Sequence, residues 1–167
     1  MRMRKKPNLI PRMERCAQFL VSDPAGQRGK WRELMPEAKQ IWLELGCGKG
    51  RFTAEMAEQH ADVLYIAVER VPDAMVIAME RCAEKKLTNV FFVDGDAARL
   101  RDYFAPEEVD RLFTVEVDTL LTKEPIYYTV TSTLSEAKNF PFFLVKNREK
   151  YNFGYSERHI PFYRNLT

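Results

Sequence analysis

The amino-acid sequence predicts a single α/β domain, in which a parallel sheet carries helices on both faces. From residue 40 onward, short apolar runs alternate with segments of helical periodicity, and glycines or acids follow the runs. This alternation is typical of βαβ units, whose parallel strands are joined by crossover helices. A chain of 167 residues is long enough to bury a substantial core in one domain.

Three glycines at alternate positions follow the first predicted strand, and the last of them begins the first predicted helix. Residues 40–45 (QIWLEL) are short, apolar and run into glycine, which favours a buried strand. Residues 50–61 place Phe52, Met56 and Ala57 on one face of a helix.

The next two elements repeat the pattern. Residues 63–69 (VLYIAVE) are apolar and indicate a second strand. Residues 72–87 begin with proline and end in lysines, which suits the start of a helix and the dipole at its end.

The remaining elements before the composition changes are shorter. Residues 89–96 (NVFFVDGD) predict a third strand that runs into a turn, residues 97–104 a short helix, and residues 110–117 a fourth strand.

The charge of the chain is unevenly distributed, although its net value is only +2. Residues 1–32 carry nine Lys or Arg and two acids, a balance of +7, and residues 33–121 carry ten bases and eighteen acids, a balance of −8. The basic stretch is either a solvated tail or an arm that binds phosphates. We therefore divide the chain into a basic arm (1–32), an α/β core (33–121) and a C-terminal segment of the same domain (122–167).

Several function classes are disfavoured by composition. No apolar run approaches the ~20 residues that span a bilayer, and the basic N-terminus lacks the apolar stretch of a secretion signal. Three scattered cysteines and two histidines give neither a disulfide framework nor metal-ligand spacing. We expect a cytoplasmic protein with no metal and no membrane partner.

Acids follow three consecutive predicted strands. Glu44 precedes the glycines at the lip of the first turn, Glu69 ends the second strand about twenty residues later, and Asp94-Gly95-Asp96 follow the third. In a parallel sheet, ligands bind at the carboxyl ends of the strands. An acid after the second strand can accept bonds from both hydroxyls of an adenosine ribose, and one after the third can accept from an adenine amino group.

The spacing of the glycines favours one adenosine ligand over another. Dinucleotide sites carry G-x-G-x-x-G, whereas this chain carries G-x-G-x-G with Arg51 in place of the last glycine. Glu44 would repel a pyrophosphate and attract an ammonium group. S-adenosylmethionine, with an adenosine, a sulfonium and an ammonium, suits this pattern better than NAD.

With these residues assembled, the chain resembles the bacterial tRNA (guanine-N7)-methyltransferases, which have a Rossmann-like class I methyltransferase fold. The resemblance covers about residues 1–121 and rests on these segments, in order: MRMRKKP, RGKW (28–31), LELGCGKG (43–50), YIAVER (65–70) and NVFFVDGDA (89–97). It implies that S-adenosylmethionine is contacted by Glu44, Glu69, Asp96 and Ala97 and by the glycines Gly46, Gly48 and Gly50. It also implies transfer of a methyl group to N7 of a guanine in tRNA.

The resemblance fails after the fourth strand. The family has Asn-Phe-x-Asp-Pro-Trp-Pro-Lys there, whereas this chain reads VEVDTLLTKE (115–124). An ungapped alignment places Asp118 on the family's catalytic aspartate and leaves Lys123 as a substrate-binding lysine. Arg2, Arg4, Lys5, Lys6 and Lys30 are the candidates for tRNA phosphates.

Three alternatives remain open at this point. The chain is a tRNA methyltransferase of reduced length, a catalytically impaired or truncated homologue that binds S-adenosylmethionine, or a methyltransferase acting on a small molecule. A non-enzymatic RNA-binding module would leave the three acids unexplained. The sequence does not decide between a monomer and a homodimer.

Overall fold

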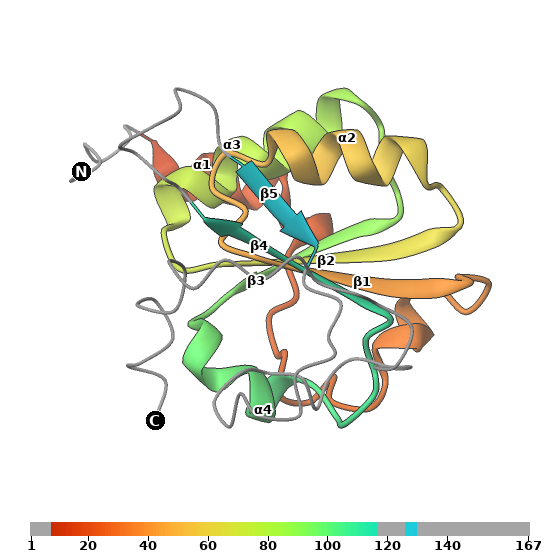
Figure 1. The fold of residues 1–167 in the computed structure, drawn as a ribbon. Helices are drawn as coiled ribbons and strands as arrows, with labels where there is room; N and C mark the ends of the chain where they lie inside the picture. The colour runs from red at the N-terminus through yellow and green to blue at the C-terminus, as the bar shows by residue number, and fades with distance from the viewer. Residues whose placement is uncertain (1–7, 117–125, 130–167) are drawn as a thin grey trace.

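The computed structural model describes residues 8–116 and 126–129, and it confirms the predicted α/β fold. These residues form a five-stranded sheet in the order β3-β2-β1-β4-β5 (Figure 1). Strands β1 to β4 are parallel, and β5 pairs with β4 in the antiparallel direction. The four parallel strands are β1 (Gln40–Leu45), β2 (Val63–Glu69), β3 (Val90–Asp94) and β4 (Arg111–Glu116), and β5 spans Ile126–Thr129.

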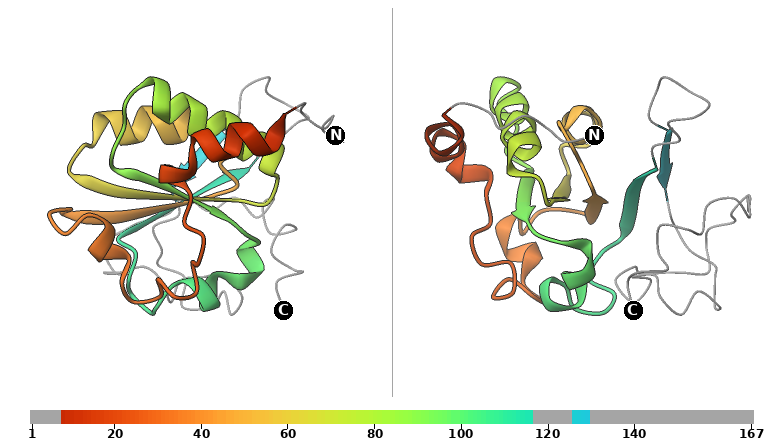
Figure 2. Two further views of the ribbon diagram at one scale, coloured as in Figure 1. Left: turned by 180° about the vertical axis from the view of Figure 1, so that it is seen from behind. Right: turned by 90° about the vertical axis from the view of Figure 1, so that its left-hand side faces the viewer.

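Helices cover both faces of the sheet, as the two views in Figure 2 show. One face carries α1 (Leu9–Arg15), α2 (Arg51–Gln59) and α3 (Pro72–Glu84), and the other carries η2 (Trp31–Leu34), η3 (Ala97–Arg99) and α4 (Leu100–Tyr103). Strand β1 shows why this happens. Trp42 faces the α2–α3 layer while Leu43 faces the other layer, so the strand is buried on both sides.

The described part of the N-terminal stretch packs onto the sheet and α3. Arg12 of α1 makes two hydrogen bonds to the carboxylate of Glu80 in α3, at 2.7 Å from Nε and 2.5 Å from Nη2. Phe19, in the short helix η1 (Ala17–Phe19), is buried in the core. The backbone N–H of Val21 donates to the carbonyl of Phe92 at 2.9 Å, so the chain lies along the outer side of β3.

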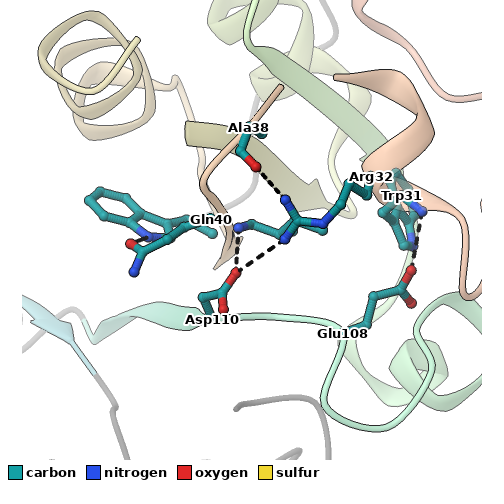
Figure 3. Close-up of polar contacts among 8 residues, drawn as sticks. Trp31, Arg32, Ala38, Gln40, Glu108 and Asp110 are labelled. Carbon is teal, nitrogen blue, oxygen red and sulfur yellow. Dashed lines mark hydrogen bonds and ion pairs between the residues drawn. The ribbon is translucent and has the colours of Figure 1, made fainter. Parts of the chain in front are cut away.

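The RGKW segment joins this stretch to the core through Trp31. Its indole is fully buried, stacks on Phe104 with ring centroids 4.9 Å apart, and donates from Nε1 to the carbonyl of Tyr103 at 2.8 Å. Glu108 accepts hydrogen bonds from the backbone N–H groups of Gly29 and Trp31, and Figure 3 shows the bond to Trp31. Trp31 is therefore a hydrophobic anchor, and stacking on a substrate base is excluded by its burial.

Gly50, the N-cap of α2, lies directly against Ala78 of α3. A Cβ added at Gly50 would lie 2.4 Å from the Cβ and 2.8 Å from the Cα of Ala78. Gly50 also has a φ of +66°, which disfavours every other residue. The last glycine of G-x-G-x-G thus permits close packing of the start of α2 against α3, whereas the last glycine of the dinucleotide pattern permits close packing of helix on strand.

The close approach predicts a large cost for a single methyl group. Gly50→Ala should lower the free energy of unfolding by about 2–4 kcal/mol, because it adds an overpacked contact to an unfavourable φ. Gly46→Ala is the matched control: its φ is +74°, but no atom of the described residues lies within 4 Å of the added Cβ, so the loss should be about 1 kcal/mol. Denaturant unfolding measures both, and equal losses would contradict the packing role.

Candidate functional site

The carboxyl ends of β1, β2 and β3 are tied together by backbone hydrogen bonds. The N–H of Gly46, after β1, donates to the carbonyl of Val68 in β2 at 2.8 Å. The N–H of Gly95, after β3, donates to the carbonyl of Glu69 at 3.2 Å. The turns that follow the three strands therefore meet at one edge of the sheet, as parallel pairing predicts.

The side chain of Glu69 strengthens this junction. Its Oε2 accepts from the N–H of Gly48 at 2.8 Å, and its Oε1 accepts from the N–H of Val71 at 2.9 Å. Glu69 is nearly buried, with 9% of its surface exposed. One carboxylate therefore fixes both the middle of the glycine loop and the start of α3.

The glycine loop leaves open space above its first two glycines. Gly46 and Gly48 have φ values of +74° and +55°, and a Cβ built on either would have no atom of residues 8–116 or 126–129 within 4 Å. The loop is also tied to α3, because Arg81 Nε donates to the carbonyl of Lys49 at 3.3 Å. The loop can thus receive a ligand against its backbone without first moving a side chain.

Asp96 lies in the turn between β3 and η3. Its Oδ1 accepts from the N–H of Ala98 at 2.9 Å and so caps η3, and its Oδ2 lies 3.4 Å from Nη1 of Arg70. Ala97, beside it, packs against the core cluster under α4. Asp94 pairs in register with Glu69. Burial and then the charge of Glu69 raise the pKa of Asp94 above its usual value.

Glu44 lies deeper than the sequence suggested. We expected its carboxylate at the lip of the glycine loop, but the structure buries it completely in the layer between the sheet and α2. Its Oε2 accepts from the hydroxyls of Thr53 at 2.7 Å and Tyr65 at 3.1 Å. Its Oε1 is buried and accepts no hydrogen bond from the described residues.

Burial determines the protonation of Glu44. The loss of hydration raises its pKa to about 7; the bonds from Thr53 and Tyr65 oppose this shift, and the like charge of Glu69 adds to it. Glu44 and Glu69 are therefore close enough to interact, although only Glu69 reaches the strand tip. Of the three predicted acids, Glu69 and Asp96 lie at the edge of the sheet and Glu44 lies beneath it.

Sequence reasoning missed Thr53 and Tyr65, the two partners of Glu44. A signal was present for each. Thr53 lies on the helical face that also carries Met56 and Ala57 and faces the core, and a hydroxyl buried there needs a partner. Tyr65 occupies the middle of a strand that is buried along its whole length, where a phenol also needs an acceptor.

Of the candidate substrate and catalytic residues, Lys30 alone falls within the part of the chain that the structure describes. Arg2, Arg4, Lys5, Lys6, Asp118 and Lys123 lie outside the described residues. Lys30 is exposed, and its neighbour Trp31 is held by Glu108, shortly before β4 begins. Figure 3 shows the same region, where Asp110 accepts from the N–H of Ile41 at 2.7 Å and pairs with Arg32. Lys30 is thus tied near the amino end of β4, away from Glu69.

The sequence predicts neither a metal site nor a membrane-spanning segment, and the structure describes only part of the chain in which either could occur. Within residues 8–116 and 126–129, no three His, Cys, Asp or Glu side chains are grouped as metal ligands. In the same part of the chain, no helix has the length and hydropathy needed to cross a bilayer. Cys16, Cys47 and Cys82 are buried free thiols.

The buried carboxyl of Glu44 predicts a pH-dependent stability. Its pKa is about 7 in the folded protein against an ordinary value of 4.5, so the folded state binds more protons than the unfolded state between these values. The stability it contributes is present at low pH and is lost as pH rises through this window, by on the order of 3 kcal/mol. The Glu44→Gln variant should lack this loss.

Unfolding of wild type and Glu44→Gln in denaturant at pH 5 and pH 8 measures the effect. The difference in unfolding free energy between the two proteins should shift in favour of the variant at pH 8. Glu55→Gln is the control, since Glu55 pairs with Arg51 on the exposed side of α2. A difference that is independent of pH would contradict the burial of an ionisable carboxyl.

Comparison with known proteins identifies relatives of this chain. Residues 38–115 match a family model described as "Putative methyltransferase". The chain is 36% identical over 113 residues to the tRNA (guanine-N(7)-)-methyltransferase of Bacillus cytotoxicus, covering 68% of this chain and 52% of that protein. The enzymes of the same name from Geobacillus kaustophilus and Streptococcus suis match at 37% and 34%, covering 52% and 53% of their lengths.

The chain thus spans about half the length of the curated relatives that it matches. The matched family model begins just before β1 and ends within β4, so it includes the glycine loop, Glu69 and Asp96. The resemblance predicted from the sequence is confirmed: over 68% of its residues, the chain is related to the bacterial tRNA (guanine-N7)-methyltransferases.

Proposed function

We propose that the chain binds S-adenosylmethionine at the carboxyl ends of β1–β3 and transfers its methyl group to N7 of a guanine in tRNA. The observation that carries the proposal is the junction at Glu69, where a nearly buried carboxylate fixes the glycine loop beneath open space. The relatives bear the name of this activity.

The residues present fit the cofactor. The open space over Gly46 and Gly48 lets a ligand lie directly on the backbone. Each oxygen of Glu69 accepts one N–H bond, and a carboxylate has about four acceptor sites, so two remain for the ribose hydroxyls. Glu44 Oε1 is a buried acceptor that the described residues leave without a donor, and a positive charge over the loop would favour its ionised form.

Asp96 and Ala97 would hold the adenine end. Asp96 is fixed by Ala98 and Arg70 at the tip of β3, next to the position that Glu69 assigns to the ribose. An acid there can accept from the adenine amino group, and Ala97 offers a small apolar surface beside it. Gly46, Gly48 and Gly50 complete the site as the backbone over which the amino-acid part lies.

The chemistry requires little acid–base assistance. When bound, the cofactor supplies an activated methyl group on a sulfonium. Guanine N7 already carries a lone pair, so no base need remove a proton before attack, and the protein's contribution is to hold the two groups in line. Asp118 is our candidate for the carboxylate that stabilises positive charge on the purine and accepts from its N1 and N2 hydrogens; this role stays a prediction.

We also propose which residues of the protein contact tRNA. The target guanine must be unstacked to enter a pocket, which favours a loop base. Arg2, Arg4, Lys5, Lys6, Lys30 and Lys123 are the candidates that bind the tRNA. The altered sequence after the fourth strand supports one second candidate: a protein that binds the cofactor but does not transfer its methyl group.

Loss of the Glu69 carboxylate should weaken cofactor binding more than loss of a comparable acid elsewhere. Glu69→Gln should raise the Kd for S-adenosylmethionine by about 10- to 100-fold, because hydrogen bonds to a charged acceptor contribute about 1.5–3 kcal/mol. Glu108→Gln is the matched control, since Glu108 also accepts backbone N–H bonds, but near the amino end of β4. Calorimetry measures both, and equal losses would place the cofactor elsewhere.

Methyl transfer tests the activity itself. Incubation with labelled S-adenosylmethionine and unmodified tRNA should label the tRNA, and Asp118→Ala should reduce the rate by at least about 100-fold. A transcript in which 7-deazaguanine replaces guanine has carbon in place of N7 and should accept no label. Cofactor binding without any label on tRNA would favour the second candidate.

A further inference from the structure

The two carboxylate oxygens of Glu44 differ in their hydrogen bonding. Oε2 accepts from both Thr53 and Tyr65, whereas Oε1 accepts from none of the described residues although it is fully buried. A buried acceptor without a donor costs free energy, and the cost is larger for a charged group than for a neutral one. An arrangement of this kind favours the protonated form of the Glu44 carboxyl as long as no positively charged group lies close to it.

The groups around Glu44 come from four elements. Tyr65 and Glu69 belong to β2, Thr53 to α2, Cys47 to the glycine loop and Cys82 to α3. On the β4 side the register neighbour of Glu44 is Phe113, which carries no charge. Within the described part of the chain, the charge that acts on Glu44 is therefore the like charge of Glu69, which disfavours a second carboxylate.

A cation placed over the glycine loop reverses this balance. The loop begins at Gly46, two residues after Glu44, and Cys47 within the loop interacts electrostatically with Glu44. Within the described part of the chain, the backbone of Gly46 and Gly48 has open space beside it. In the weakly screened interior, a positive charge there acts strongly on a buried carboxyl. The ammonium of the amino-acid part of S-adenosylmethionine supplies such a charge.

We infer that binding of an amino-acid-bearing cofactor over the glycine loop expels the proton of Glu44 to solvent, and that Thr53 and Tyr65 are positioning residues that hold the carboxylate formed. The step is balanced: the carboxyl O–H bond breaks, the proton passes to the buffer, and the carboxylate remains, stabilised by the ligand's charge and by the two hydroxyls. The inference rests on the proposed function for the identity of the ligand.

Calorimetry in two buffers of different ionisation enthalpy, such as phosphate and Tris, counts the protons released. At pH 6.5, wild-type protein should release on the order of half a proton or more on binding S-adenosylmethionine, since Glu44 is then largely protonated (its pKa is about 7). S-adenosylhomocysteine keeps the ammonium and should release as many. Methylthioadenosine lacks the amino-acid part and should bind without release.

Variants assign the proton to Glu44. Glu44→Gln should bind the cofactor with no release, because its amide does not ionise. Thr53→Val removes a donor to the carboxylate, so it should weaken binding about 3- to 10-fold and shift the pH at which half of the release is lost upward; Thr53→Ser should restore both. A purely structural role for Thr53 would lower stability without moving this pH.

The outcomes separate the inference from the proposed function. If neither S-adenosylmethionine nor S-adenosylhomocysteine binds, the proposed function fails. If both bind but the heats are the same in the two buffers from pH 6 to 8, the proposed function stands and the inference is wrong. Should Glu44→Gln fail to fold, the comparison of S-adenosylhomocysteine with methylthioadenosine on wild-type protein decides: equal release by both would overturn it.

Discussion

The carboxylate of Glu69 is the interaction on which the organisation of this edge of the sheet depends. Through its two oxygens it holds the N–H groups of Gly48 and Val71, and through its backbone carbonyl it holds Gly95. One residue at the tip of the central parallel strands thereby links the turns that follow β1, β2 and β3. A ligand that bridges those turns meets donors and acceptors already fixed in place, so it has little ordering left to do.

The glycine loop combines rigidity on one side with access on the other. Toward the protein, Gly50 lies against Ala78 and Lys49 accepts from Arg81, so the loop is fixed by α3. At Gly46 and Gly48, by contrast, no side chain of the described residues approaches the position of an added Cβ. The three glycines of one short motif therefore serve two physical purposes: the last permits helix packing, and the first two leave room for a ligand.

The elements that were predicted best are those whose sequence marks their ends. Strands β1 and β2 have the predicted bounds, because apolar runs stop at Gly46 and at Arg70, and α3 begins at the predicted proline. The segment 97–104 divides into η3 and α4, since Asp96 caps a tight first turn. Helix α1 was not predicted from the sequence. Its packing depends on Glu80, which is distant in sequence, and no local sequence pattern indicates that contact.

The depth of Glu44 shows where strand patterns lose information. In a strand with one wet face, alternation assigns each residue to a side, but β1 is buried on both faces and offers no such alternation. An acid in such a strand reads equally well as a rim residue or as a core residue. Only the buried hydroxyls of Thr53 and Tyr65, which come from other elements, distinguish the two.

The cofactor half of the proposed reaction is separable from the substrate half in this chain. Every residue proposed to hold S-adenosylmethionine lies between Glu44 and Ala97, inside the segment that matches the family model and folds into β1–β3 with their helices. The residues proposed for guanine and all of those proposed for tRNA binding come before or after that segment. Because the junction at Glu69 is complete without them, cofactor affinity should not depend on the altered sequence after β4, whereas methyl transfer should depend on it entirely.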